Sequence, residues 1–219
     1  MGIAQIGKSF RNEISPRGGL IRMREFDMAE LEYFIDPEIN HHPKIDKIKD
    51  IVATFYPREG QEKVGFSGIK MSFREALESQ LIKSEPLAYY VALSYKFCLD
   101  IGMLAEKIRL RQHMMNEMAH YACDCWDIEI MINDDWIECI GIANRQSYDL
   151  KAHAKATGQN FDAQKRLEKP VKTTELNYKL NKNALFGENK ENAKMIMSSL
   201  KKMSIVDLES CKKSLESKG

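Results

Sequence analysis

The 219-residue sequence has no apolar run of the roughly 20 residues that a membrane-spanning helix needs. Its first twenty residues carry Lys8, Arg11, Glu13 and Arg17 and lack the apolar stretch of a secretory signal. Proline and tryptophan are scarce, at 6 and 2 residues, and the 12 glycines follow no repeat, so a collagen-like chain is excluded. Hydrophobic residues at 43% and charged residues at 30% are typical of a globular protein with one large domain or two small ones.

Cysteine is also scarce, and its five residues are an odd number: Cys98, Cys123, Cys125, Cys139 and Cys211. Without an export signal they are interpreted as reduced thiols of a cytoplasmic protein. Cys123 and Cys125 have no second cysteine pair nearby, so the sequence favours buried structural thiols over a zinc site. His113 and His120 lie seven residues apart with no matching set of carboxylates, so metal ligation by these histidines is also disfavoured.

Charge is distributed unevenly along the chain. Residues 151–219 hold 15 Lys and Arg against 8 Asp and Glu, which leaves 18 against 24 for residues 1–150. A basic tail on an acidic body can contact a polyanion, although solvated surface charge is the commoner explanation for such a pattern. Composition alone leaves both interpretations open.

Residue spacing predicts an α+β chain with an antiparallel sheet flanked by helices. Ser, Pro and paired Gly at 15–19 predict a hairpin with a five-residue loop, and Ser72 with Glu75 forms a capping box that opens a helix. Periodicity then predicts the remaining elements. The expected strands cover 4–14, 20–35, 107–114 and 136–143, the expected helices cover 72–81, 84–101, 116–130, 192–200 and 204–215, and a turn is expected at 133–135, whereas 160–183 shows no clear period.

The predicted hairpin carries an unusual load of charge. Arg11 and Glu13 are expected on one face of the first strand, because side chains two residues apart point the same way. Arg22 and Arg24 are expected on one face of the second strand, with Phe26 in phase. The pattern by itself is compatible with either a functional site or a solvated sheet face.

Residues 2–9 (GIAQIGKS) match the phosphate-loop pattern G-x-x-x-x-G-K-[ST]. That pattern cradles phosphate only where a strand enters the loop and a helix leaves it. Here only Met1 precedes the first glycine, and Phe10–Ile14 alternates toward a turn. A phosphate-loop nucleoside triphosphatase is therefore not predicted.

Three longer blocks resemble class II aminoacyl-tRNA synthetases, in the form of the eukaryotic and archaeal-type glycyl-tRNA synthetases. Residues 10–37 (FRNEISPRGGLIRMREFDMAELEYFIDP) resemble motif 2 of that family. Residues 111–127 (RQHMMNEMAHYACDCWD) and 136–150 (WIECIGIANRQSYDL) resemble two further segments in the same order, and His153 and Ala154 continue the match. The resemblance covers about residues 4–158, so we expect a partial class II catalytic core over 1–158 and a lysine-rich insertion or tail over 159–219.

The resemblance implies a glycine–tRNA ligase, which uses ATP and Mg²⁺ to activate glycine as glycyl-adenylate and transfers it to tRNA(Gly). It implies that Arg11 is the catalytic arginine that clamps the α-phosphate and the substrate carboxylate, a task suited to a guanidinium that grips planar anions at two points. Phe26 matches the ring that stacks on adenine, Glu13 matches the residue near the adenine amino group, and Glu138 is a candidate Mg²⁺ ligand. The implied ATP-binding set is Arg11, Asn12, Glu13, Arg22, Met23, Phe26, Glu138 and Cys139.

The resemblance also implies positions for glycine and tRNA. Glu30 matches the acid that pairs with the glycine ammonium, and Arg145 matches an arginine near its carboxylate. Arg17, in the loop Ser15–Gly19, is the implied contact to the tRNA acceptor stem. From the residues alone, Glu30 and Glu32 are equally compatible with solvated acids, and Arg145 with a strand-end cap. Asn144 stands where the family usually has aspartate.

Motifs 1 and 3 of the family and its anticodon-binding domain have no match in these residues. We therefore expect a partial catalytic domain that is inactive when isolated. The resemblance also implies a homodimer for the family's full-length enzymes. A function of another class remains open, in which a truncated, non-catalytic synthetase copy binds RNA or a synthetase subunit.

Overall fold

The computed structural model describes residues 2–164, 166, 169–170, 172 and 192–217. The chain divides into two compact units, Met1–Phe161 and Asp162–Gly219, which are described separately. No helix in the described ranges is both long enough and apolar enough to cross a membrane.

A five-stranded sheet forms the body of the first unit, in the order β4-β3-β5-β6-β7. Its strands are β3 (Val52–Tyr56), β4 (Ile69–Ser72), β5 (Ile108–Gln112), β6 (Asp124–Ile132) and β7 (Asp135–Asn144). Strands β3 and β5 run parallel, and the other neighbours are antiparallel. The sheet is thus mostly antiparallel and flanked by helices, which confirms the predicted fold class.

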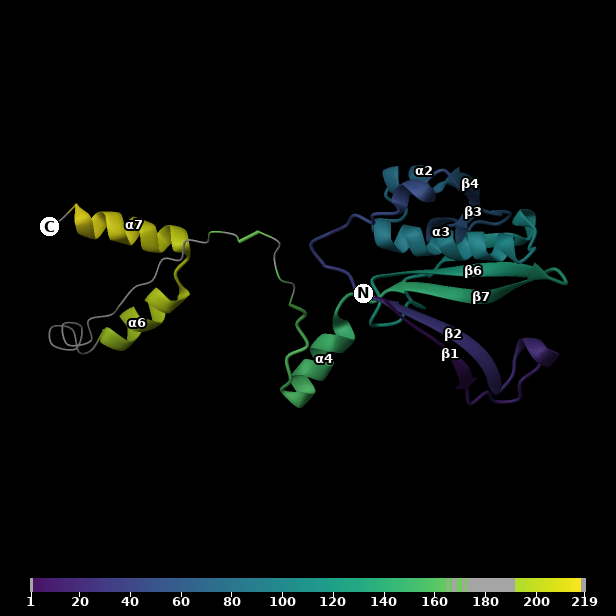
Figure 1. The fold of residues 1–219 in the computed structure, drawn as a ribbon, viewed down its shortest axis with the longest axis horizontal. Helices are drawn as coiled ribbons and strands as arrows, with labels where there is room; N and C mark the ends of the chain where they lie inside the picture. Colours follow the sequence, from purple (N-terminus) through teal and green to yellow (C-terminus); the bar gives the residue numbers. More distant parts are fainter. Residues whose placement is uncertain (1, 165, 167–168, 171, 173–191, 218–219) are drawn as a thin grey trace. The chain divides into compact units, whose positions relative to one another are not determined.

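One face of the sheet is covered by helix α3 (Glu85–Asp100), which lies along β6 and β7 (Figure 1). The apolar stripe of α3 includes the fully buried Val91 and packs with Phe55, Leu110 and Ile128 of three different strands. Helix α2 (Phe73–Glu78) begins with the predicted capping box at Ser72. The smaller helices of this unit are α1 (Arg58–Gln61) and α4 (Tyr148–Thr157), neither of which was predicted.

The N-terminal hairpin forms a separate two-stranded sheet from β1 (Gly2–Phe10) and β2 (Glu25–Tyr33). The prediction that it joins the larger sheet is therefore wrong. The strands are also shorter than predicted and the connection runs over 11–24, because Ser15, Gly18 and Gly19 have positive φ and Gly19–Ile21 forms a 3-10 turn. Residues 2–9 lie in β1, which confirms that they form no phosphate loop.

The predicted helix over 116–130 is wrong as well. Residues 113–123 form turns and irregular backbone, and Asp124–Ile132 is strand β6. Trp126, Ile128 and Ile130 are buried toward the core, and this alternation suits a strand better than a helix. The predicted strands near 107–114 and 136–143, the helix from Ser84 and the turn at 133–135 are confirmed.

The second unit contains α6 (Ala193–Lys202) and α7 (Ile205–Glu216), which confirms the two helices predicted near the C-terminus. The Ser204 side chain accepts the Asp207 backbone N–H at the start of α7, in a capping box. Most of the aperiodic stretch 160–183 lies outside the described residues.

Candidate nucleotide and glycine site

Arg11 and Phe26 meet at the charged end of the hairpin. The Arg11 guanidinium carbon lies 5.3 Å from the centre of the Phe26 ring, which is within the range of a cation–π contact. Phe26 is half-buried on β2, whereas Arg11 follows the end of β1 and is exposed. The two residues assigned to the α-phosphate and the adenine ring are therefore neighbours.

The polar residues around Arg11 are held across the connection by hydrogen bonds outside the regular strands. The Arg11 N–H donates to the Arg24 carbonyl over 3.0 Å, and Arg24 Nε donates to the Glu13 carbonyl over 2.9 Å. Arg22 Nη1 lies 3.6 Å from Glu13 Oε2. The predicted strand phases are wrong because β1 ends at Phe10, but Arg11, Glu13 and Arg22 still gather in one place. The candidate residues Asn12, Arg17 and Met23 are exposed.

Arg145 links the hairpin to the larger sheet. It follows β7, and its Nη1 lies 3.1 Å from Glu32 Oε1 of β2, while its Nη2 lies 2.5 Å from Asp149 Oδ2 of α4. Its guanidinium also lies over the Tyr121 ring at 4.5 Å. Burial alone would lower the pKa of Arg145, but the Asp149 hydrogen bond and the Asp149 and Glu32 charges raise it above the usual value.

The acid of β2 that bonds to Arg145 is Glu32, not the predicted glycine ligand Glu30. The two glutamates lie two residues apart on β2, so they share one face of the strand. Glu30 itself is exposed. Sequence reasoning missed the role of Glu32, and only the spacing from Glu30 could have indicated it.

The face of the larger sheet opposite α3 carries a network of charged side chains. Arg109 Nε donates to Glu129 Oε2 over 2.6 Å. The Arg109 guanidinium carbon also lies 4.2 Å from the centre of the Tyr56 ring and 4.3 Å from that of the Trp136 ring. In the next register pair, Arg111 Nη1 lies 3.6 Å from the buried Asp127. The sequence reasoning missed this network because it assigned 116–130 to a helix.

Glu138 lies on this charged face of the sheet, next to a β-bulge. Ile128 pairs with Ile140 and Glu129 pairs with Glu138, so Cys139 is the extra residue between them. A Cβ placed on Gly141 would lie 3.6 Å from Asp127 Oδ1 and 3.7 Å from Glu138 Oε1, so the two carboxylates converge over this glycine. Burial, followed by the Glu138 charge, raises the pKa of Asp127 to about 6.

Converging carboxylate oxygens are the donors that Mg²⁺ prefers, so Glu138 and Asp127 fit the predicted magnesium site. The structure thus forms two groups of candidate residues, one at the hairpin around Arg11 and one on the larger sheet around Glu138. That a nucleotide spans both groups stays a prediction. Cys139 is exposed, and its Sγ lies 3.5 Å from the Ile137 carbonyl.

The five cysteines differ in their surroundings. Cys98 and Cys125 are buried, whereas Cys123, Cys139 and Cys211 are exposed. The prediction of a buried structural thiol is therefore confirmed for Cys125 and wrong for Cys123. Burial, together with the Asp127, Asp124 and Glu138 charges, raises the pKa of the Cys125 thiol to about 12. Both buried thiols are therefore poor nucleophiles in this environment.

Comparison with known proteins identifies the family. The tRNA synthetase class II core domain (G, H, P, S and T) matches residues 1–218. The chain is 48% identical to the glycine–tRNA ligase of Drosophila melanogaster over 218 residues, which is 99% of this chain and 28% of that protein. It is 44% identical to the mitochondrial glycine–tRNA ligase 1 of Saccharomyces cerevisiae over 216 residues, covering 99% of this chain and 31% of that protein.

An archaeal relative gives the same result. The glycine–tRNA ligase of Methanocaldococcus jannaschii is 43% identical over 225 residues, covering 100% of this chain and 39% of that protein. The chain thus spans between 28% and 39% of the length of these relatives. Because the family model extends over nearly all of it, the chain belongs to the class II tRNA synthetase core domain family.

Proposed function

We propose that this chain supplies the ATP and glycine contacts of a glycine–tRNA ligase. The observation that carries the proposal is the similarity of nearly the whole chain to glycine–tRNA ligases of a fly, a yeast and an archaeon. The contact of Arg11 with Phe26 supports it, because one residue of that pair is assigned to the phosphate and the other to the base. The proposed substrates are ATP, glycine and tRNA(Gly), and the proposed location is the cytoplasm.

In the proposed reaction, a glycine carboxylate oxygen attacks the α-phosphorus of ATP and pyrophosphate leaves. A hydroxyl of the terminal tRNA adenosine then attacks the glycyl carbonyl, and AMP leaves. Negative charge grows on phosphate oxygens in the first step, so positioning and fixed positive charge supply the catalysis. Mg²⁺ bound near Glu138 and Asp127 would neutralise charge on the phosphates.

The side chains divide these tasks by their chemistry. Phe26 stacks on adenine, while Arg11 leaves its ring contact and grips the α-phosphate and the glycine carboxylate. Glu30 accepts the glycine ammonium, and Arg145 faces its carboxylate from a position fixed by Glu32 and Asp149. Small size is the distinguishing property of glycine, so a short distance between these charged groups would select it.

The proposal is tested by a chimera. The matching 218-residue segment of the Drosophila glycine–tRNA ligase is replaced by this chain, and both ATP–pyrophosphate exchange and aminoacylation of tRNA(Gly) are measured. Glycine-dependent exchange by the chimera is expected. A folded chimera with no exchange would contradict the proposal. RNA binding by the isolated chain would then favour the alternative of a non-catalytic synthetase copy. The excess of Lys and Arg in residues 151–219 supports that alternative.

Arg11→Ala in this chimera is expected to lower kcat/KM for exchange by about 10²–10³, because a preorganised charge is lost where the transition state becomes more negative. Arg11→Lys is expected to recover only part of the loss, since an ammonium cannot grip two oxygens in the same plane. The matched control is Arg17→Ala, which should leave exchange unchanged and weaken tRNA aminoacylation. A loss below threefold in Arg11→Ala would contradict the assigned role.

Glu32→Gln is expected to raise the glycine KM of the chimera about two- to fivefold with little change in kcat, since an exposed ion pair contributes up to about 1 kcal/mol. Asp149 still holds the other side of the guanidinium. Glu30→Gln removes the proposed ammonium contact itself. It should raise the glycine KM at least about tenfold more than Glu32→Gln does. Equal effects of the two substitutions would show that Glu32 is not merely a positioning residue.

A further inference from the structure

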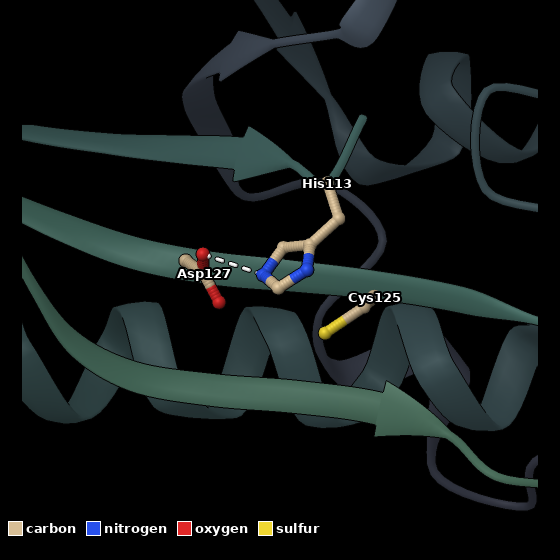
Figure 2. A group of neighbouring side chains, drawn as sticks. All are labelled: His113, Cys125 and Asp127. Carbon is tan, nitrogen blue, oxygen red and sulfur yellow. Dashed lines mark hydrogen bonds and ion pairs between the residues drawn. The ribbon is translucent and has the colours of Figure 1, made fainter. Parts of the chain in front are cut away.

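Three potential metal ligands of different chemistry meet on the face of the larger sheet opposite α3. They are His113, Cys125 and Asp127, which offer a nitrogen, a sulfur and an oxygen that all lie within 4.8 Å of one another. Figure 2 shows the His113 ring extending over strand β6 between the Asp127 carboxylate and the Cys125 sulfur. This group of three residues is called the mixed-donor cluster below.

The strand register brings the cluster together. Gln112 pairs with Trp126, and the His113 N–H donates to the Cys125 carbonyl over 3.0 Å, so His113 directly follows the ladder of β5 and β6. Cys125 and Asp127 are two residues apart on β6 and share one face. The carboxylate that sequence spacing failed to supply for His113 thus comes from the neighbouring strand.

Only one of the two nitrogens of the His113 ring has a hydrogen-bond partner among the described residues. Its Nε2 lies 2.7 Å from Asp127 Oδ2, but its Nδ1 is buried and has no hydrogen-bond partner among the described residues. A buried polar atom without a partner costs free energy, and such atoms are uncommon in native proteins. A neutral imidazole nitrogen with a free lone pair is also a common metal ligand in proteins.

The mixed-donor cluster differs in its donor atoms from the neighbouring pair of carboxylates, Glu138 and Asp127. Glu138 and Asp127 offer only oxygen on the side of Gly141, which suits Mg²⁺. The Cys125 sulfur and the His113 nitrogen are softer donors that select zinc-like cations. The two sides of Asp127 therefore favour different metal ions.

We propose that His113, Cys125 and Asp127 bind one zinc-like divalent cation through nitrogen, sulfur and oxygen. A water molecule completes a tetrahedron, as in zinc sites with three protein ligands. Typical zinc–ligand bonds place such donors about 3.3–3.6 Å apart, so the three donor atoms move closer together when the ion binds. Asp127 then exchanges its hydrogen bond with His113 Nε2 for the bond to the ion. Cys125 binds as the thiolate, and its proton leaves to solvent.

The test uses the purified 219-residue chain with a phosphine reductant and Co²⁺ as the probe. A tetrahedral site with a thiolate is expected to give a sulfur-to-cobalt charge-transfer band in the near ultraviolet together with intense visible bands. We expect saturation at one ion per chain, displacement of cobalt by Zn²⁺, and no displacement by excess Mg²⁺. Absence of the charge-transfer band would overturn the proposal.

Variants identify the ligands. Cys125→Ser should abolish the charge-transfer band, and His113→Gln and Asp127→Asn should each weaken cobalt binding by at least about tenfold. Cys123→Ser and His120→Gln are the controls, because these residues are exposed neighbours outside the cluster, and they should leave the band unchanged. A band that survives Cys125→Ser but disappears in Cys123→Ser would overturn the assignment.

Folding of the variants is followed by far-ultraviolet circular dichroism and thermal melting. Zn²⁺ should raise the Tm of the unsubstituted chain, since a ligand that binds only the folded state stabilises it. His113→Gln retains most of the ring's volume, so it should fold and lose the Zn²⁺-dependent rise in Tm. An undiminished rise in folded His113→Gln would overturn the proposal independently of the cobalt spectra.

Discussion

The 219-residue chain expressed by itself is expected to give no glycine-dependent ATP–pyrophosphate exchange above background. The family's motif 3 arginine for the γ-phosphate and its second glycine-binding acid have no match in these residues. Each lost charge contact costs about 10²–10³ in rate, so together the losses are on the order of 10⁴ or more if they add. The hairpin that carries Arg11 is also a separate two-stranded sheet, which has little stability of its own.

Weak ATP binding by the same chain is expected to survive, because Phe26 and Arg11 remain available for the base and the α-phosphate. Exchange is measured with labelled pyrophosphate, and binding by titration calorimetry, with Arg11→Ala as the control. Robust exchange that disappears in Arg11→Ala would show that the residues in this chain suffice for adenylate formation.

Phe55→Ala is expected to lower the free energy of unfolding by about 3–5 kcal/mol, the usual cost of emptying a buried phenylalanine site. Phe55 is fully buried on β3, and its ring packs edge-on against the rings of Phe73 and Trp126 at 5.1 and 5.8 Å. These two residues belong to α2 and β6, so neither can move into the cavity without disturbing its own element. Urea unfolding followed by tryptophan fluorescence measures the loss.

The matched control is Phe97→Ala on α3, where the side chain is 55% exposed. A substitution there should cost less than about 1 kcal/mol, because little apolar surface leaves the core. Comparable losses in the two variants would show that Phe55 does not occupy the centre of the core.

The elements that the sequence predicted correctly are those with local signals. Helix α2 has both halves of its capping box, and α3 has a serine cap at Ser84 and a continuous apolar stripe. Spacing alone predicts a helix where β6 lies, because Met118, Ala122, Cys125 and Trp126 follow helical periodicity. What makes 124–132 a strand is its pairing with β5 and β7, which is a tertiary interaction.

Strands β3 and β4 were missed for a related reason. They are only 5 and 4 residues long, too short for alternation to distinguish them from irregular chain. Strand β3 lies beside β5, more than fifty residues further along the chain, and this pairing is parallel. Without knowledge of that neighbour, the sequence offers little to predict either strand.

In the candidate site, too, the sequence predicts the roles of single residues but not their contacts. Resemblance to a family assigned roles to Arg11, Phe26, Glu30 and Arg145, but it could not predict that Arg145 bonds Glu32. The pairing of His113 with Asp127 likewise depends on the register of two antiparallel strands. Residue types were therefore predictable where a motif names them, whereas distances and partners required the fold.

The hairpin has a consequence for handling the protein. Ile3, Ile6 and Phe10 of β1 are each more than half exposed, and among the described residues β1 pairs only with β2. Its second edge therefore presents free backbone donors and acceptors beside apolar side chains, which is a template for adding a foreign strand. Preparations of the isolated chain should consequently self-associate with increasing concentration, and Ile6→Lys, at an 83% exposed position, should suppress that tendency without unfolding the core.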